Sequence, residues 1–136
     1  EAPQDLQQVW FAGVHSDVGG MFADGSRLSD VPLKWMVQAA AAAGLRLDPA
    51  ASAEAESQVT LDSATGAVHA NSRVWWLAGW PRLRRVPQGA LLHASVAERL
   101  RTHPAYAKRL PEVGGYAFVD PAWLTSHVPV RPPPSP

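Results

Sequence analysis

A continuous apolar run near the start of the chain limits the folds that this sequence can adopt. Residues 9–14 are all apolar or glycine, and apolar and polar side chains do not alternate within them. A short unbroken run with β-branched and aromatic residues is typical of a strand buried on both faces, in a parallel sheet covered by helices. The run therefore predicts a central α/β strand over residues 8–14, with Phe11 in the core.

A polar loop closed by two glycines follows this strand and reads His15-Ser16-Asp17-Val18-Gly19-Gly20. In open α/β sheets, functional loops lie at the carboxyl ends of strands. Asp17 is a candidate for a carboxylate that orients a distant histidine, or for one that bonds the amides of the Gly19-Gly20 turn. A complete triad within His15-Ser16-Asp17 is excluded, because neighbours in an extended segment point to opposite sides.

A metal site built on this loop is a weaker hypothesis. His15, Asp17 and Asp24 are acids and a histidine within one short segment, but they match no recognised ligand spacing. We therefore expect neither a metal nor a cofactor.

A helix is predicted over residues 29–43. Ser29 or Asp30 can cap it, and Pro32 fits only in a first turn. Gly44 supplies the end of the helix. The expected buried stripe, at helical spacing, consists of Leu33, Met36, Val37 and Ala40.

A second histidine stands close to another predicted helix start. Residues 89–92 form a short apolar run that ends at His93. Ser95 and Glu98 have the spacing of a capping box, so we expect Ser95 to cap a helix that ends before Pro104. This arrangement places His93 where it can reach into a pocket.

The remaining segments give weaker signals. Residues 73–79 suggest a second strand, residues 48–57 a loop or a short helix, and residues 62–66 a turn. The chain carries six tryptophans and thirteen prolines, which indicates irregular loops rich in both. Five of the prolines lie in residues 129–136, a tail expected to be polyproline-like.

Composition excludes several classes of protein. The 136 residues are enough for one domain or part of one. With 12 positive and 12 negative side chains, a nucleic-acid binder with a broad basic surface is not expected. No apolar run approaches the roughly 20 residues of a transmembrane helix. The absence of cysteine excludes disulfides and thiolate ligands.

The order of the two candidate groups indicates a class of enzyme. An acid after a buried strand, followed later by a histidine, fits the α/β-hydrolase order of nucleophile, acid and histidine. No serine here has the Gly-x-Ser-x-Gly context of the nucleophile elbow. We expect the elbow to lie upstream of residue 1.

Three segments resemble one protein family, in the family's own order. Residues 9–20 resemble the signature of α/β-hydrolase-like proteins long catalogued as a domain of unknown function, which include phospholipase effectors of the bacterial type VI secretion system. Residues 28–36 resemble the helix start that follows, and residues 92–99 resemble a later His-x-Ser-Val-x-x-Arg element. Met21 departs from the family pattern, which has a third glycine there.

The resemblance implies a role for each loop residue. Asp17 would be the triad acid and His93 the triad histidine, with His69 in a competing segment. Four loop residues would be supporting positions: His15, Ser16, Gly19 and Gly20. Residues 1–128 would form the C-terminal part of an α/β-hydrolase-like domain, with a partial sheet, flanking helices and a proline-rich tail over 129–136.

Two functions follow as hypotheses. The first is the C-terminal portion of a serine hydrolase of the lipase, phospholipase or esterase kind, whose nucleophile comes from the upstream part of the same protein. Its substrate would be a lipid or another ester, and either the bacterial cytoplasm or secretion would suit it. The second is a non-catalytic interaction module that keeps half of the fold, with tryptophans and arginines forming a partner surface.

Overall fold

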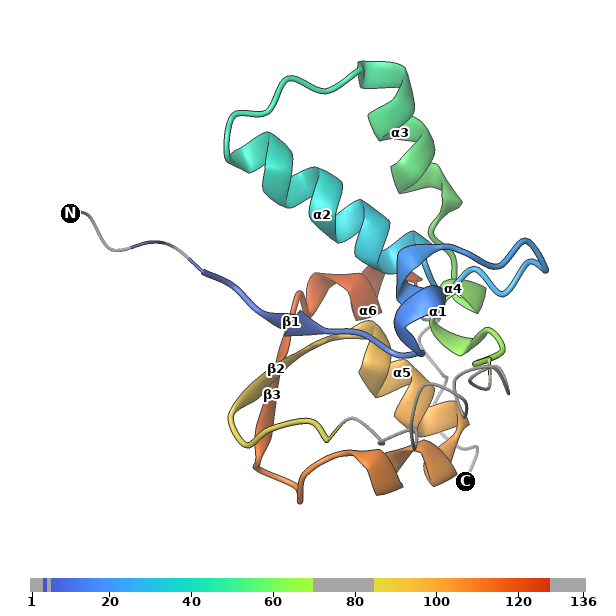
Figure 1. Ribbon diagram of the computed structural model, residues 1–136, viewed down its shortest axis with the longest axis vertical. Helices are drawn as coiled ribbons and strands as arrows, with labels where there is room; N and C mark the ends of the chain where they lie inside the picture. Colours follow the sequence, from blue (N-terminus) through green and yellow to red (C-terminus); the bar gives the residue numbers. More distant parts are fainter. Residues whose placement is uncertain (1–3, 5, 70–84, 128–136) are drawn as a thin grey trace, which may run out of the picture.

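The computed structural model describes residue 4, residues 6–69 and residues 85–127, and at 107–109 it describes the backbone alone. Three strands are separated by helices along the chain (Figure 1). In order they are β1 (Val9–Trp10), α1 (His15–Gly19), α2 (Asp30–Ala42), α3 (Pro49–Gln58), α4 (Asp62–Thr65), β2 (Ala90–His93), α5 (Ser95–Thr102), the 3₁₀ helix η2 (Pro104–Arg109), β3 (Tyr116–Val119) and α6 (Ala122–His127).

The three strands form one parallel sheet in the order β1-β2-β3. Trp10 lies opposite Leu92, and Leu92 lies opposite Phe118. A parallel sheet with helices around it agrees with the predicted partial α/β fold. The prediction of a central strand over residues 8–14 is wrong for the described part of the chain, because β1 is an edge strand of two half-buried residues. The strand ends early because the chain turns at Gly13, whose φ is +115°.

Two apolar clusters form the core, one on each face of the sheet. Helix α5 and η2 cover one face, where Leu92 packs with Val96 and Tyr106. On the other face, Phe11 meets the ring of Trp35 from α2. The buried members of the second cluster are Val31, Val59, Ala64, Ala94 and Trp123. The segment from β2 into α5 contributes to both clusters and therefore joins them.

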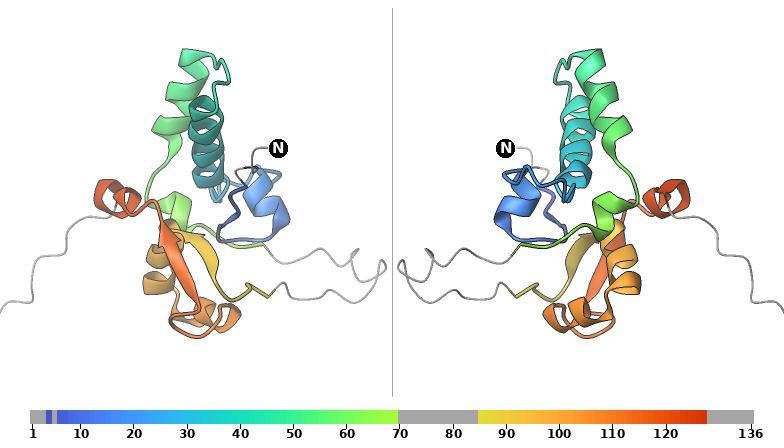
Figure 2. Two further views of the ribbon diagram at one scale, coloured as in Figure 1. Left: turned by 90° about the vertical axis from the view of Figure 1, so that its left-hand side faces the viewer. Right: turned by 90° about the vertical axis from the view of Figure 1, so that its right-hand side faces the viewer.

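Helix α2 confirms the predicted helix, with Pro32 in its first turn and Gly44, at φ +89°, after its end. The predicted buried stripe is wrong: Leu33 is 48% exposed and Met36 is 59% exposed. Val31 and Pro32 are buried instead, so α2 turns a different face to the core. The helix packs beside α3, and the pair extends away from the sheet (Figure 2).

The cap of α2 also differs from expectation. Ser29 occupies the N-cap position without a side-chain cap bond. Asp30 is the first helical residue, and its carboxylate lies 2.9 Å from Nε of Arg27 and accepts a bond from Ser63 Oγ at 3.1 Å. Asp30 therefore ties the start of α2 to α4 instead of capping it.

Two ambiguous segments are helical. The segment predicted as a loop or a short helix at 48–57 is α3, which runs from Pro49 to Gln58. Asp48 caps it by accepting the amides of Ala50 and Ala51 at 2.8 and 3.0 Å. The turn expected at 62–66 is the short helix α4 followed by Gly66. The strand predicted at 73–79 and the tail at 129–136 lie outside the described residues.

Helix α5 begins at Ser95 and ends at Thr102, before Pro104, as the sequence predicted. The predicted cap is wrong, because Ala94 occupies the N-cap position and Ser95 is the first helical residue. The Ser95 hydroxyl meets Nδ1 of His93 at 2.9 Å and not the amide of Ala97 or Glu98. The buried histidine offers this hydroxyl a nearer partner than the helix does.

Candidate functional site

The segment after β1 is a short helix and not the extended loop that we expected. Val14 is at the N-cap of α1, and Asp17 is the third helical residue. Its Oδ2 accepts the Val14 amide at 2.8 Å, which is the carboxylate half of a capping box. Successive helical side chains diverge by about 100°, so His15 is exposed, Ser16 is half-buried and Asp17 is buried.

Asp17 pairs with a histidine from a distant part of the chain. Its Oδ1 lies 2.5 Å from Nδ1 of His69, and its Oδ2 accepts the His69 amide at 3.3 Å. The carboxylate side chain is wholly buried, whereas the imidazole is 22% exposed. Of the two histidines that the sequence left open, the structure therefore brings His69 to Asp17.

Glycines shape the surroundings of this carboxylate. At Gly13, whose φ is +115°, an added Cβ would lie 2.6 Å from Cβ of Asp17, so no side chain fits there. Gly20 ends α1 in the left-handed conformation and donates its amide to the carbonyl of Ser16. The Gly19-Gly20 turn therefore closes the helix, and the amide partners of Asp17 are Val14 and His69.

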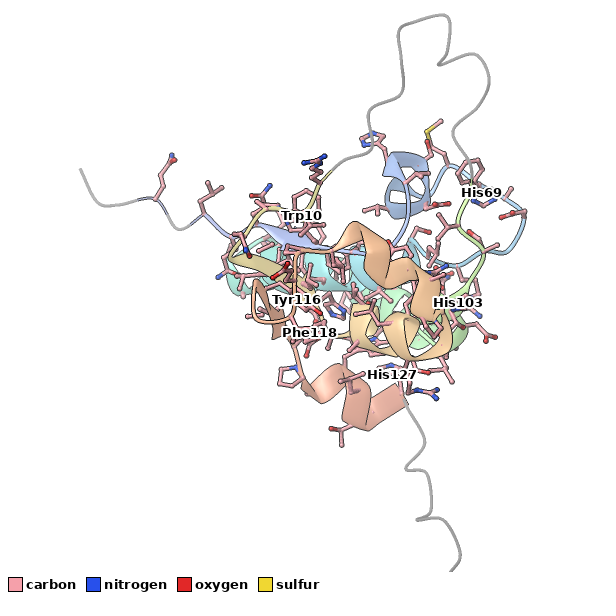
Figure 3. The ribbon with its side chains drawn as sticks, turned by 90° about the horizontal axis from the view of Figure 1, so that it is seen from below. Trp10, His69, His103, Tyr116, Phe118 and His127 are labelled. Carbon is pink, nitrogen blue, oxygen red and sulfur yellow. The ribbon has the colours of Figure 1, made fainter. Side chains whose placement is uncertain are left out.

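The second nitrogen of His69 faces another carboxylate. Nε2 lies 2.6 Å from Oδ2 of Asp24, whose side chain is 52% exposed on the segment between α1 and α2. The ring of Phe22 stacks on the imidazole with centroids 3.6 Å apart. Figure 3 shows His69 beside α1, well apart from Tyr116 and Phe118 on β3.

The two carboxylates favour a charged imidazole. Hydrogen bonds to Asp17 first, and to Asp24 second, raise the pKa of His69 above its ordinary value. The bond to His69 is also the main cause that lowers the pKa of Asp24. The imidazole of His69 therefore lies between two carboxylates, and each of them favours its charged form.

His93 lies in the core, with other partners. Its Nδ1 accepts the amide of Ser95 at 3.1 Å, and its Nε2 lies 3.2 Å from Oδ2 of Asp120. The ring stacks on Phe11 with centroids 5.1 Å apart. Burial lowers the pKa of His93, although the charge of Asp120 opposes the shift. His93 is therefore bonded to Ser95 and Asp120, while Asp17 is bonded to His69.

A second set of side chains has the residue types of a catalytic triad: Ser95, His93 and Asp120. Ser95 is 4% exposed and His93 is 1% exposed, so a substrate has no access to the hydroxyl. The bonds instead join the end of β2 to the start of α5 and to the residue after β3. We interpret this set as a structural junction.

Two features of the described residues bear on ligands and membranes. Within residues 4, 6–69 and 85–127, no three histidine or acidic side chains gather as a metal site would require. Among the helices of the same residues, none has the length and apolar character to cross a bilayer.

The position of His69 was weakly signalled by the sequence, and the contact of Asp24 with it was not foreseen. His69 stands in a segment of low information, Gly66-Ala67-Val68-His69, and Asp24 stands in a short polar loop. The available signal was the presence of a second histidine downstream of Asp17. Which histidine pairs with Asp17 depends on how distant segments of the chain pack together, and this packing cannot be read from the positions of the histidines in the sequence.

Comparison with known protein families gives a match at the start of the chain. Residues 1–39 match the family model described as T6SS, Phospholipase effector Tle1-like, catalytic domain. No curated protein and no solved structure matches the chain. The matched residues include Asp17 and Asp24, and the family is the one that the sequence motifs indicated. Residues 1–39 are therefore similar to the catalytic domain of Tle1-like phospholipase effectors, which supports a hydrolase-like role in general.

Proposed function

We propose that this chain supplies the acid and the base of a serine ester hydrolase, with Asp17 as the acid and His69 as the base. The observation that carries the proposal is the 2.5 Å contact between Oδ1 of Asp17 and Nδ1 of His69. A buried carboxylate on one imidazole nitrogen is the arrangement that activates serine nucleophiles. The similarity of residues 1–39 to a phospholipase catalytic domain supports the same reaction class.

The geometry assigns each nitrogen of His69 a task. Nδ1 would stay protonated and donate a hydrogen bond to Asp17, so in the neutral ring the lone pair would lie on Nε2. Nε2 would take the proton of a serine hydroxyl as that oxygen attacks the ester carbonyl. The imidazolium would then return the proton to the leaving alkoxide, and Asp17 would stabilise its charge throughout. Water would complete the cycle by hydrolysing the acyl-enzyme.

Asp24 occupies the side of His69 that this reaction needs. Its carboxylate lies 2.6 Å from Nε2, where the serine hydroxyl would have to be. While Asp24 holds Nε2, this nitrogen cannot take the proton of a serine, so the arrangement with Asp24 in place is a resting one. Asp24 is half exposed, and its movement away from the ring would free Nε2.

The nucleophile and the substrate complete the proposal. We assign the serine to the upstream part of the same protein, as the order nucleophile, acid, histidine requires. The substrate is an ester of lipid character. Phe22, which is 39% exposed, stacks on the His69 ring, and its neighbour in the sequence, Met21, is 76% exposed. The two side chains offer an apolar surface to an acyl chain.

A non-catalytic interaction module is the second candidate. Exposed apolar side chains on α2, Leu33 at 48% and Met36 at 59%, favour it, because such residues often mark a contact surface. The buried acid–histidine pair gives it no support, since a binding surface has no need of one.

Covalent labelling tests the proposed function directly. The protein that carries these 136 residues together with the upstream serine is treated with a fluorophosphonate, which marks activated serines. We expect labelling, and hydrolysis of a short-chain ester and of a phospholipid, to be lost together in His69→Ala. Wild-type labelling and hydrolysis in that variant would overturn the role of His69 as the base, whereas a wild-type protein that shows neither labelling nor hydrolysis would favour the interaction module. Ser57→Ala is the control, because Ser57 is exposed on α3 and away from the pair, and it should react like the wild type.

A further inference from the structure

Arg99 is a buried cation close to the candidate site. It lies on α5 and is 4% exposed. Burial lowers the pKa of its guanidinium, and the negative charge of Asp17 is among the influences that oppose this shift. Buried charges are costly unless they are paired and hydrogen-bonded. Contacts of the guanidinium with other groups of the protein must therefore offset the cost of burying its charge.

One set of contacts reaches the segment that leads to His69. Nη1 of Arg99 donates to the carbonyls of Ala64 and Gly66, both at 2.9 Å. These carbonyls lie at the end of α4, where helical carbonyls lack partners within the helix. The chain reaches His69 three residues after Gly66. Arg99 therefore fixes the point from which His69 extends toward Asp17.

A second contact reaches the segment that carries Asp17. The guanidinium of Arg99 lies over the ring of Tyr106, 5.2 Å from its centroid, at a distance typical of a cation–π contact. The Tyr106 hydroxyl accepts the amide of Gly13 at 3.2 Å. The backbone of Gly13 lies against the side chain of Asp17, where an added Cβ would be 2.6 Å from Cβ of Asp17.

We propose that Arg99 is a positioning residue, which holds the two segments bearing His69 and Asp17 in register. This inference rests on the proposed function. One side chain supports both members of the pair, through the carbonyls of Ala64 and Gly66 on one side and through Tyr106 on the other. Neither Arg99 nor Tyr106 touches the reacting atoms, so both act through the residues that they hold.

If Arg99 had only a structural role, its replacement would change the stability of the protein and not the pairing of His69 with Asp17. Nε of Arg99 is buried without a hydrogen-bond partner among the described residues, so the guanidinium is incompletely satisfied. Replacing a buried, incompletely paired charge by an apolar side chain of similar volume often leaves a protein as stable, or makes it more stable. Arg99→Met therefore separates positioning from stability, because it removes the donors and keeps much of the volume.

The test uses the protein that includes the upstream serine. Arg99→Met is expected to lower kcat/KM for a short-chain ester by about 100-fold, the loss typical of a small displacement of a catalytic group. Arg99→Lys should lose nearly as much, because an ammonium that donates to the carbonyls of Ala64 and Gly66 leaves no planar group to lie on the Tyr106 ring. Arg46→Met, which removes the same charge from an exposed position, should behave like the wild type.

A second readout follows the pair itself. The titration of His69 is followed by NMR with labelled histidine, and His69→Gln identifies its signal. In Arg99→Met the pKa of His69 should fall toward its ordinary value, because the bond to Asp17 loosens. An unchanged His69 titration in Arg99→Met or Arg99→Lys, with or without loss of activity, would overturn the positioning role. If Arg99→Met does not fold, Arg99→Lys carries the test alone.

The two proposals fail in distinguishable ways. A fall in the pKa of His69 in Arg99→Met, in a protein whose ester hydrolysis survives His69→Ala, would support the positioning role and overturn the role of His69 as the base. Loss of hydrolysis in His69→Ala, with an unchanged His69 titration in Arg99→Met, would support His69 as the base and overturn the positioning role of Arg99.

Discussion

Nδ1 of His69 lies 2.5 Å from Oδ1 of Asp17, across 52 residues of sequence. The backbone amide of His69 donates to the same carboxylate, at 3.3 Å from Oδ2. Ring and main chain therefore both fix this histidine to the acid. Because the carboxylate is buried, its interaction with the imidazole is screened less than a surface pair would be.

Asp17→Asn should nearly abolish ester hydrolysis while the protein stays folded. The amide keeps the shape of the carboxylate but can hold the imidazole in the wrong tautomer, which lowers turnover by about 10⁴-fold in a comparable triad. Steady-state kinetics on a short-chain ester measure the loss, and circular dichroism checks the fold. Glu112→Gln, an exposed neutralisation, is the matched control. Turnover within tenfold of the wild type in Asp17→Asn would contradict the assignment of the acid.

The two histidines should respond differently to removal. His69→Ala should abolish hydrolysis. The ring is partly exposed and leaves no buried cavity, so any loss of stability should come from the buried Asp17 carboxylate, which keeps the Val14 amide as a partner. His93→Ala should cost about 2–4 kcal/mol of unfolding free energy, because it leaves a cavity beside Phe11 and removes the bonds to Ser95 and Asp120. Urea unfolding and activity below the transition measure the two effects. If His93→Ala is stable and inactive while His69→Ala is active, His93 is the base.

Asp24→Asn should shift the acidic limb of the pH–rate profile to lower pH. Catalysis needs neutral His69, and the bonds to Asp17 and Asp24 raise its pKa, so the neutral form appears only as pH rises through that raised value. Asparagine removes one of the two causes, and the neutral form then appears at lower pH. The gain should be largest in acid and should fade in alkali. Profiles of kcat/KM for both proteins measure it, and an unshifted limb would show that Asp24 does not bind His69 in the free enzyme.

Gly13→Ala should impair both stability and activity. The left-handed φ of +115° costs a non-glycine residue on the order of 1–3 kcal/mol, and the new methyl group would press on Cβ of Asp17. Gly44→Ala separates the two effects, because Gly44 has a φ of +89° but open space around it. Thermal unfolding and ester hydrolysis are measured for both variants. We expect Gly44→Ala to lose stability alone, and equal activity losses in the two variants would contradict the close approach of Gly13 to Asp17.

Local sequence signals predicted the helices whose ends are marked by proline or glycine. Pro32 and Gly44 mark the two ends of α2, and Pro104 marks the end of α5. The fixed φ of proline and the left-handed freedom of glycine act within one turn, so they can be recognised without tertiary information. Strand β3 and helix α6 were not predicted, although Pro121 stands immediately before the first residue of α6.

Side-chain orientation depends on packing, and here the sequence was a poor guide. The predicted stripe on α2 includes Leu33 and Met36, which are exposed, whereas Trp35 meets Phe11. Helical spacing shows which residues share a face but not which face meets the sheet. The hydroxyl of Ser95 likewise bonds to His93, although its spacing to Glu98 indicated a cap.

The sequence by itself determined that a carboxylate would follow the first strand, because the apolar run, Asp17 and the closing glycines are adjacent along the chain. It also determined that two histidines downstream were candidates for its partner. Only the tertiary structure decided between them, since it buries His93 with Ser95 and Asp120 and brings His69 to Asp17. The reason is physical: the partner of a buried charge depends on which distant segments pack together, and Arg99 and Tyr106 hold those segments from outside the pair.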